Sequence, residues 1–153
     1  MAIAAGVTEN AGMYERPPSL DDGSALARVR AVCLALPEVT ERPSHGAPTF
    51  FVAGKRSFAT CVDNHHHDGR LALWCASAAG MQAAHVEHDP DGYFVPPYVG
   101  GRGWLGVRLD RGLSWDAIAG ALEDAYAAVA PKRLVDAAAA LRAERDRAGS
   151  QPP

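Results

Sequence analysis

The sequence predicts an α+β fold, in which an antiparallel sheet of about five to six strands packs on helices. Three observations lead to it. The spacing of apolar residues predicts, in chain order, one helix, four strands, one helix, two strands and two helices. Glycine turns of hairpin length separate neighbouring strand patterns. The length of 153 residues, 48% of them hydrophobic, suits one core and is too small for two ordinary domains.

The first half of this domain is predicted as a helix followed by a meander of hairpins. Apolar residues three and four apart begin near Ser24 and continue to Leu36, where Pro37 ends the helix. Strands are then predicted over residues 39–45, 49–52, 57–63 and 71–75. The turn between the second and third strands is short, so Gly54 or Lys55 is expected to adopt a backbone conformation that few residues tolerate.

The second half adds a short helix, two strands and two longer helices. The short helix is predicted over residues 78–88 and ends at Asp89-Pro90, and the strands follow at residues 93–95 and 104–110. Ser114 is a good N-cap and Asp116 favours the first turn of the helix that stops before Pro131. A last helix begins near Leu134. The domain is predicted to span residues 21–147, between a flexible lead at 1–20 and a disordered tail at 148–153.

Aromatic, proline, glycine and arginine residues are concentrated before the last strand. Two prolines and two glycines bracket Tyr98 and Arg102, which makes residues 96–102 a stiff projection followed by a flexible turn; we call this segment the arm. In the strand that follows, Trp104 and Arg108 share one side by alternation. Trp104 is expected to be buried by a covering loop, whereas Tyr98 is expected to be exposed and Arg108 to reach solvent.

Charge and cysteine content restrict the class of protein. The net charge is −3, so any nucleic-acid contact depends on a local patch. Residues 42–111 contain seven Lys or Arg against six Asp or Glu, which makes this region less acidic than the rest. The three cysteines have no CxxC spacing and predict buried thiols in a reducing compartment. No apolar run approaches a membrane span, and the sequence predicts a cytoplasmic protein without a membrane partner.

Several ordered blocks of the sequence resemble one known family. They are ALPEVTERPSHGAPTFFVAGKRSFAT at residues 35–60, YFVPPYVGGRGWLGVRL at residues 93–109 and DAYAAVAPKRL at residues 124–134. Together they resemble the MmcQ/YjbR family of small bacterial proteins, also called the DUF419 group, over residues 24–135. The resemblance implies the CyaY-like fold and a DNA-binding role. The three histidines at residues 65–67 depart from the family pattern and leave the role of that loop open.

The leading functional hypothesis from the sequence is a non-enzymatic DNA-binding protein. Basic hairpin tips and the arm would contact phosphates, and the exposed aromatic ring of the arm would stack on bases. The residues predicted to contact DNA are Arg42, Lys55, Arg56, Arg70, Tyr98, Arg102, Arg108, Lys132 and Arg133. The opposing interpretation of the same residues is an ordinary mixed-charge surface.

The alternative is a protein that binds or sequesters a small planar molecule in a cleft between the sheet and the arm. The aromatic, proline and glycine content of residues 92–104 suggests such a cleft. The other aromatic strand residues, Phe50, Phe58, Trp74 and Trp104, are expected to fill space against the helices. Fold analogy alone also suggests a frataxin-like role in iron handling, but the first helix region offers no acidic ridge.

No catalytic residue, cofactor or dedicated metal site is predicted. Asp63, His65 and His67 share one side of an extended loop, yet no third distant ligand is evident beyond a spatial partner such as His45. No Ser, His and acid combination is suggested, and the glycine turn of the arm precedes a strand rather than a helix. The sequence therefore favours a binding protein over an enzyme, and it does not indicate an oligomeric state.

Overall fold

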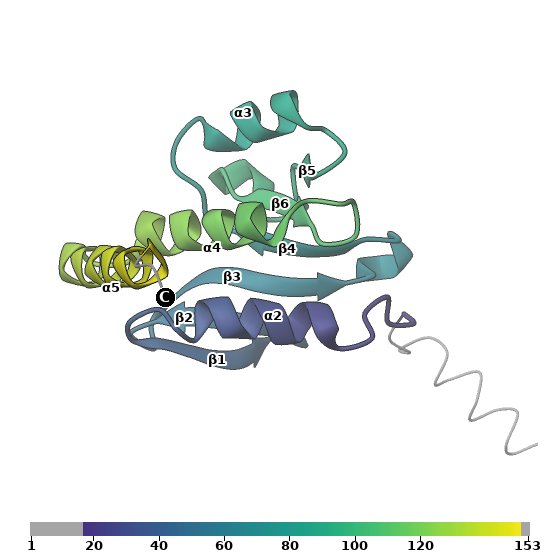
Figure 1. Ribbon diagram of the computed structural model, residues 1–153. Helices are drawn as coiled ribbons and strands as arrows, with labels where there is room; N and C mark the ends of the chain where they lie inside the picture. Colours follow the sequence, from purple (N-terminus) through teal and green to yellow (C-terminus); the bar gives the residue numbers. More distant parts are fainter. Residues whose placement is uncertain (1–16, 151–153) are drawn as a thin grey trace, which may run out of the picture.

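The computed structural model describes residues 17–150, and in these residues six antiparallel strands form one sheet in the order β1-β2-β3-β4-β6-β5 (Figure 1). The strands are β1 (Val39–Ser44), β2 (Ala47–Val52), β3 (Arg56–Asp63), β4 (Leu71–Cys75), β5 (Tyr93–Phe94) and β6 (Leu105–Arg108). The helices are α2 (Ser24–Cys33), α3 (Met81–His88), α4 (Trp115–Val129) and α5 (Lys132–Ser150), with short 3-10 turns η1 (His65–His67) and η2 (Gly100–Arg102). The predicted α+β class and the predicted order of elements are confirmed.

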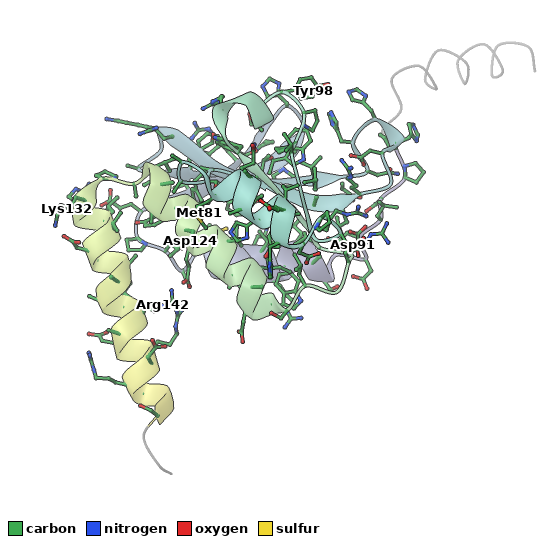
Figure 2. The ribbon with its side chains drawn as sticks, turned by 90° about the horizontal axis from the view of Figure 1, so that it is seen from above. Met81, Asp91, Tyr98, Asp124, Lys132 and Arg142 are labelled. Carbon is green, nitrogen blue, oxygen red and sulfur yellow. The ribbon has the colours of Figure 1, made fainter. Side chains whose placement is uncertain are left out.

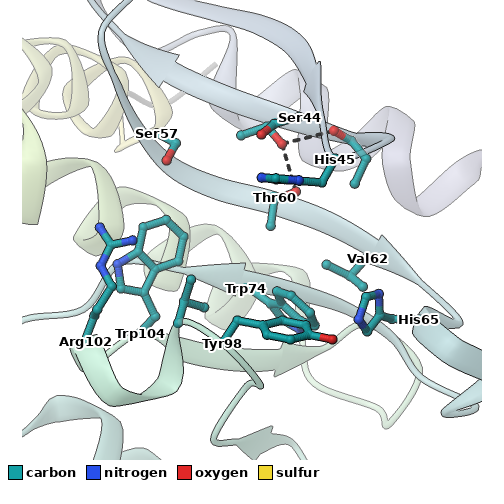
Figure 3. A pocket seen from close by; sticks show the side chains of 13 residues that line it. Ser44, His45, Ser57, Thr60, Val62, His65, Trp74, Tyr98, Arg102 and Trp104 are labelled. Atoms are coloured by element: carbon teal, nitrogen blue, oxygen red, sulfur yellow. Dashed lines mark hydrogen bonds between the residues drawn. The ribbon is translucent and has the colours of Figure 1, made fainter.

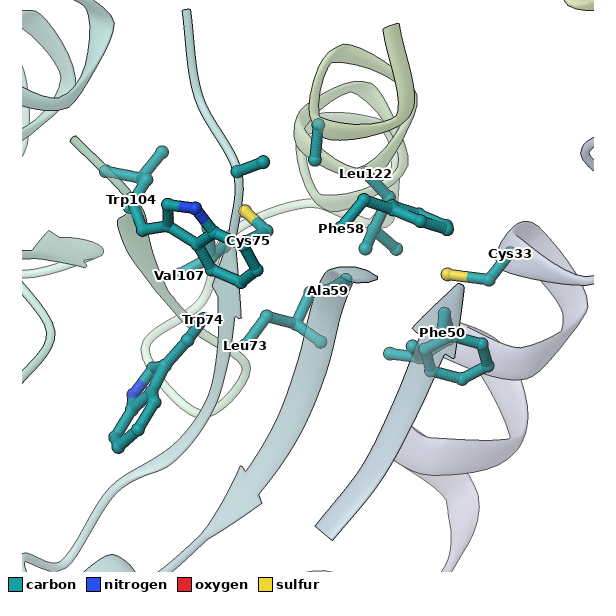
Figure 4. Packing of buried hydrophobic residues seen from close by; sticks show 14 of the residues in the cluster. Cys33, Phe50, Phe58, Ala59, Leu73, Trp74, Cys75, Trp104, Val107 and Leu122 are labelled. Atoms are coloured by element: carbon teal, nitrogen blue, oxygen red, sulfur yellow. The ribbon is translucent and has the colours of Figure 1, made fainter. Parts of the chain in front are cut away.

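Helices α2 and α4 cover one face of the sheet, and the core lies between them and the strands (Figures 1 and 4). Phe58 of β3 meets Tyr126 of α4 edge to face, with ring centroids 5.7 Å apart. The Tyr126 hydroxyl donates to the carbonyl oxygen of Pro37 over 2.8 Å, which ties α4 to the chain entering β1. Because this hydroxyl has a partner, a large aromatic side chain is buried without an unsatisfied polar group.

A β-bulge in the second hairpin decides which side chains of β3 face away from the helices. Phe51 pairs with Ser57, whereas the preceding residue, Phe50, pairs with Ala59, so Phe58 is the extra residue. Alternation alone would place Ser57 and Thr60 on opposite faces, since they are three positions apart. The extra residue puts both of them on the face opposite the helices while Phe58 and Ala59 remain in the core.

The turn before β3 has the unusual backbone that its length predicted. Gly54 has φ 68°, and the preceding Ala53 also has a left-handed φ of 53°. Lys55 closes the turn by donating its backbone N–H to the carbonyl oxygen of Val52 over 3.0 Å. The prediction for Gly54 is confirmed, whereas the left-handed conformation of Ala53 is a finding of the structure.

The ends of the helices differ from the sequence prediction in two places. Helix α2 ends at Cys33 rather than Leu36, and the intervening residues form a turn that leads to Pro37. Helix α5 continues to Ser150, so residues 148–150 of the predicted tail are helical. Residues 1–16 of the predicted lead and residues 151–153 lie outside the described residues.

Residues 17–20, the described part of the predicted lead, are tied to the end of β3. The backbone N–H of Leu20 and the hydroxyl of Ser19 donate to the carboxylate of Asp63 over 2.8 and 2.6 Å. The side-chain amide of Asn64 donates to the carbonyl oxygen of Pro18 over 2.9 Å. The carboxylate of Asp63 is therefore engaged by the chain that enters α2.

Helix α5 extends away from the rest of the domain (Figure 2). Of its residues, Leu134 is buried. Arg142 and Arg145 reach back to Glu123 of α4, at 2.8 and 3.4 Å. No helix in the described region is both long enough and apolar enough to span a membrane.

Candidate functional site

The sheet face opposite α2 and α4 contains a pocket of about 600 Å³ (Figure 3). Its floor is built across three neighbouring strands, because Thr49 of β2 pairs with Thr60 of β3 and Thr60 pairs with Trp74 of β4. Residues paired directly across antiparallel strands have their side chains on the same face. These three side chains, joined by Ser57, therefore form one continuous surface, and the arm lies along its edge.

The arm is held in a fixed conformation by specific backbone contacts. Tyr98 has φ 64°, a left-handed conformation that is unfavourable for an aromatic residue and that is found preferentially at functional sites. The Gln82 side chain of α3 donates to the carbonyl oxygens of Gly100 and Trp104, over 2.8 and 2.6 Å. At Gly100 an added Cβ atom would lie 2.6 Å from Val95 Cγ1, so the arm packs against the preceding chain too closely for a larger residue.

Three rings form the aromatic side of the pocket. The Tyr98 ring lies 6.2 Å from the Trp74 ring, and the His65 imidazole lies 5.1 Å from Trp74 and 5.7 Å from Tyr98, measured between centroids. Trp74 is only 8% exposed, whereas Tyr98 is 75% exposed. Figure 3 shows the Trp74 and Tyr98 side chains next to each other, with His65 beside them. A flat ligand could stack on such a surface.

Trp104 and Arg102 lie at the other end of the pocket from His65 (Figure 3). The guanidinium carbon of Arg102 lies 5.4 Å from the centroid of the Trp104 ring, a cation–π distance. Within residues 17–150 no carboxylate forms an ion pair with Arg102, and the described residues that line the pocket include no Asp or Glu. The pocket thus has aromatic walls and uncharged polar groups of Ser, Thr and His, with one positive charge at one end.

Burial of Trp104 and exposure of Tyr98 confirm the sequence prediction, but two aromatic placements were wrong. Trp104 is 8% exposed, against 75% for Tyr98. Trp74 and Trp104 were expected to pack against the helices, whereas both line the pocket on the opposite face. The reason is the strand register, which pairs Trp74 with Thr60 and with Gly106 on the face away from the helices.

The polar floor of the pocket presents oxygen lone pairs. Thr49 Oγ1 lies 2.9 Å from Thr60 Oγ1, and the two hydroxyls also reach the carbonyl oxygens of Ala47 and Pro48 over 3.0 and 3.2 Å. Two hydroxyl protons are shared among these three contacts, so both protons are already used within the protein. The hydroxyl oxygens can accept further hydrogen bonds but have no proton left to donate to a ligand.

Two histidines of the pocket come from turns rather than strands. His45 follows β1 with φ 51°, and His65 opens η1. The His65 Nε2 atom is buried without a hydrogen-bond partner in the described structure. Burial, together with the neighbouring His66, lowers the pKa of His65 below its ordinary range. His66 and His67 are exposed, and His65–His67 form a 3-10 turn rather than the extended loop that would place His65 and His67 on one side.

The basic residues predicted to contact DNA are distributed over different parts of the molecule. Three lie on the pocket face with the guanidinium above an aromatic ring: Arg42 over Phe51 at 3.6 Å, Arg70 over Phe94 at 4.2 Å and Arg102 over Trp104 at 5.4 Å. Lys55 and Arg56 are exposed at the β2–β3 turn. Lys132 and Arg133, at the start of α5, form ion pairs with Asp136 and Glu38.

The expectation that Arg108 reaches solvent is wrong. Its side chain is 11% exposed and pairs with Asp110, with Nε 2.8 Å from Oδ1. Asp110 also accepts a hydrogen bond from the backbone N–H of Leu71, so the pair fastens the end of β6 to the start of β4. Arg108 therefore has a structural partner in Asp110. The sequence, in which the two residues are two positions apart, did not predict this pair.

Neither a thiol nucleophile nor a metal centre is evident in the described region. Burial raises the pKa of Cys61 and of Cys75 to about 12, and it raises the pKa of Cys33 further. All three thiols are free and buried, as predicted. Between residues 17 and 150, no three His, Cys, Asp or Glu side chains are grouped so that they could bind a metal ion.

Two residues of the pocket floor and the residue that holds the arm were not predicted from the sequence. Thr49, Thr60 and Gln82 received no role; polar and apolar residues do not alternate regularly over residues 56–63, so periodicity gives no signal for Thr60. Local spacing gives no signal for Gln82 either, because its two acceptors lie 18 and 22 positions away in the chain.

The fold and the site together define a small α+β protein with helices on one face of an antiparallel sheet and a ligand-sized pocket on the other. The chain belongs to the YjbR family, whose sequence model matches residues 34–128. The crystal structure of Deinococcus radiodurans protein DR2400, which is described as a DUF419 domain, has a similar fold. The two chains are 18% identical, and the match covers 74% of this chain and 83% of that chain with a TM-score of 0.59. No curated protein matches the chain.

Proposed function

We propose that this protein binds a small planar aromatic molecule in the pocket between the sheet and the arm. The observation that supports the proposal is the pocket itself, which has a volume of about 600 Å³ and is lined by Trp74, Tyr98 and Trp104. Pockets that take small molecules typically have volumes of about 300–1,000 Å³, with apolar walls and a few polar groups that orient the ligand. This pocket has both properties.

The backbone of the arm supports a binding role. Tyr98 is the most exposed large hydrophobic residue of the described region, and its left-handed backbone is unfavourable for folding alone. Because the backbone of the arm is already held beside the pocket, the Tyr98 ring can contact a flat ligand with little loss of conformational entropy on binding. Because Gln82 fixes the backbone on both sides of Arg102, the site is largely formed before a ligand arrives.

A neutral two-ring compound, 2-naphthamide, is a suitable first probe. A fragment of this size is expected to bind with a dissociation constant on the order of 1 mM or lower, at about −0.3 kcal/mol per heavy atom. Quenching of tryptophan fluorescence and calorimetric titration would measure it. Tyr98→Ala should weaken binding, whereas Leu141→Ala, at an exposed site on α5, should leave it unchanged. Absence of binding to the wild-type protein would contradict the proposal.

A second candidate function is contact with single-stranded DNA across the same face of the sheet. The observation that favours it is that Arg42, Arg70 and Arg102 lie on this face without ion pairs among the described residues, each above an aromatic ring. These arginines suit the phosphates of a single strand, and the exposed ring of Tyr98 on the same face suits its bases, whereas Phe51, Phe94 and Trp104 under the arginines are buried. Lys55 and Arg56 would extend the basic surface at the neighbouring turn. Arg108, Lys132 and Arg133 would contribute less, because each has a carboxylate partner.

The two functions can be separated by residues that lie outside the pocket. Replacing both Lys55 and Arg56 by Ala should weaken binding of an oligonucleotide and reduce its salt dependence, since each lost phosphate contact lowers the slope by about one. The same change should leave 2-naphthamide binding unaltered. If the wild-type protein binds no oligonucleotide at low salt, the DNA function is excluded and the small-molecule function is untouched.

A further inference from the structure

We propose that the natural ligand of the pocket is a planar aromatic anion, and that Arg102 binds its negatively charged group. This inference rests on the proposed small-molecule function and adds the charge of the ligand and its orientation. It follows from the arrangement of charges and lone pairs around the pocket.

Arg102 is placed to bind a carboxylate or a similar anionic group. Its guanidinium carbon lies 5.4 Å from the centroid of the Trp104 ring, and Trp104 is buried, so the guanidinium has a cation–π partner whose position is fixed by packing. An arginine in such a contact still has N–H groups available, and these match the two oxygens of a carboxylate. Gln82 fixes the backbone carbonyls on either side of Arg102, which limits the positions that the guanidinium can take.

Nothing acidic in the described lining of the pocket competes for this charge. The remaining polar side-chain groups there are hydroxyls, two imidazoles and the indole N–H groups of two tryptophans. Every other arginine that the structure describes lies outside the lining of the pocket, and six of them are paired with a carboxylate. An arginine next to an apolar pocket without an acidic partner is typical of a site for an anionic ligand.

The floor of the pocket determines where the anion lies. The protons of Thr49 and Thr60 are used between these hydroxyls and backbone carbonyls, so these two side chains present oxygen lone pairs to the pocket. Lone pairs repel a carboxylate, and the part of the floor formed by Thr49 and Thr60 therefore disfavours the anionic group. With the charge at Arg102, the aromatic part extends along Trp74 and Tyr98 towards His65 (Figure 3).

Two probes of the same shape test the charge. Titration of the wild-type protein with 2-naphthoate and with its neutral amide, 2-naphthamide, should show the carboxylate binding about tenfold more tightly at low salt. At pH 8 an imidazole of ordinary pKa is neutral, so the measurement isolates the arginine. The preference should decrease as salt is added, because Arg102 is exposed.

Single substitutions test whether Arg102 causes the preference for 2-naphthoate over 2-naphthamide. Arg102→Gln should bind both probes equally while still binding 2-naphthamide. Arg42→Gln is the matched control, because Arg42 also stacks on a ring of the same sheet face but does not line the pocket, and it should keep the preference. His65→Gln should keep it as well.

The outcomes separate this inference from the proposed function. Equal affinity of the wild-type protein for the two probes, or a preference that survives Arg102→Gln, would overturn the assignment of an anionic ligand to Arg102. In both cases binding of 2-naphthamide would leave the proposed function standing. If neither probe binds, the proposed function fails and this inference fails with it.

Discussion

The side-chain nitrogen of Gln82 lies 2.6 Å from the carbonyl oxygen of Trp104 and donates to it. The same amide donates to Gly100 over 2.8 Å, so one side chain of α3 spans the end of the arm and the start of β6. Helix α3 has no buried residue of its own. Its clearest structural contribution is therefore this contact, which positions the arm over the pocket.

Loss of the Gln82 contact should loosen the arm and weaken the pocket. In Gln82→Ala the carbonyl oxygen of Trp104 loses its side-chain donor and that of Gly100 keeps only the backbone N–H of Gly103, so we expect the free energy of unfolding to fall by about 1–3 kcal/mol, together with weaker binding of 2-naphthamide. Urea denaturation and calorimetry would measure the two effects. Glu87→Ala, at an exposed position of the same helix, is the control and should change stability by less than about 0.5 kcal/mol. Equal effects of the two substitutions would contradict the role of Gln82.

Gly106 should tolerate no side chain. A Cβ atom there would lie 2.5 Å from the Phe94 ring, which packs directly over the backbone of β6. Gly106→Ala would force Phe94 and Arg70 above it to move, and we expect a loss of about 1–3 kcal/mol in stability. Gly101→Ala is the matched control, since nothing lies within 4 Å of the position that its methyl group would take and its φ is not left-handed. A thermal melt that shows the same shift for both would argue against the Phe94 contact.

Trp104 and Tyr98 should differ in what they stabilise. Trp104→Ala removes a buried ring, and such truncations cost about 3–5 kcal/mol of unfolding free energy. Tyr98→Ala removes an exposed ring and should change ligand binding before it changes stability. Parallel denaturation and binding curves would test the division, and a large stability loss in Tyr98→Ala would show that the arm contributes to the core.

The β2–β3 turn should respond in opposite directions to two small substitutions. Ala53 has a left-handed backbone, which costs about 1 kcal/mol for a residue with a Cβ atom, so Ala53→Gly should stabilise the protein slightly. Gly54→Ala should destabilise it for the same reason. Chemical denaturation of the two variants would measure both effects. Destabilisation by Ala53→Gly would indicate that the added conformational entropy of the unfolded chain outweighs the relief of backbone strain in the folded protein.

His65 should make stability depend on pH. Burial, and then the nearby His66, lower its pKa from the ordinary value of 6.5, while Asp68 opposes them. The unfolded chain then binds a proton at higher pH than the folded protein does, so stability should fall as the pH drops through and below about 6.5. Urea denaturation from pH 8 to pH 5 should show a smaller decline for His65→Gln than for the wild-type protein. Identical pH profiles would contradict the prediction, and His67→Gln, at an exposed position of the same turn, is the control.

The strands and helices were predictable because each has a local signal. An apolar run after a glycine turn identified β4 at its observed bounds, and the Ser114 cap identified the start of α4, where its hydroxyl accepts from the N–H of Ala117. Helix ends were less accurate. Leu36 continues the helical spacing of α2, but the chain turns after Cys33. The periodicity of apolar residues does not reveal such a turn.

The pocket could be predicted only in part, because it depends on pairing between distant strands. The arm and its exposed Tyr98 were evident from proline and glycine positions. The face on which Trp74 lies depends on register, and the common face of Ser57 and Thr60 depends on a bulge at Phe58. A bulge changes the parity of a strand by one residue without a distinct sequence signature. Sequence periodicity therefore located the aromatic residues but assigned two of them to the wrong side of the sheet.

The strand order has a consequence for the kinetics of folding. Strands β1, β2 and β3 each pair with the next strand in the chain, whereas β4 pairs with β6, which lies between β4 and β5 and follows α3 and the arm in the chain. Short turns close with little loss of entropy, so the four-stranded meander should form early and β6 should dock late. The pocket is then completed in the last step of assembly. A bound ligand would accordingly slow unfolding and leave the rate of folding nearly unchanged.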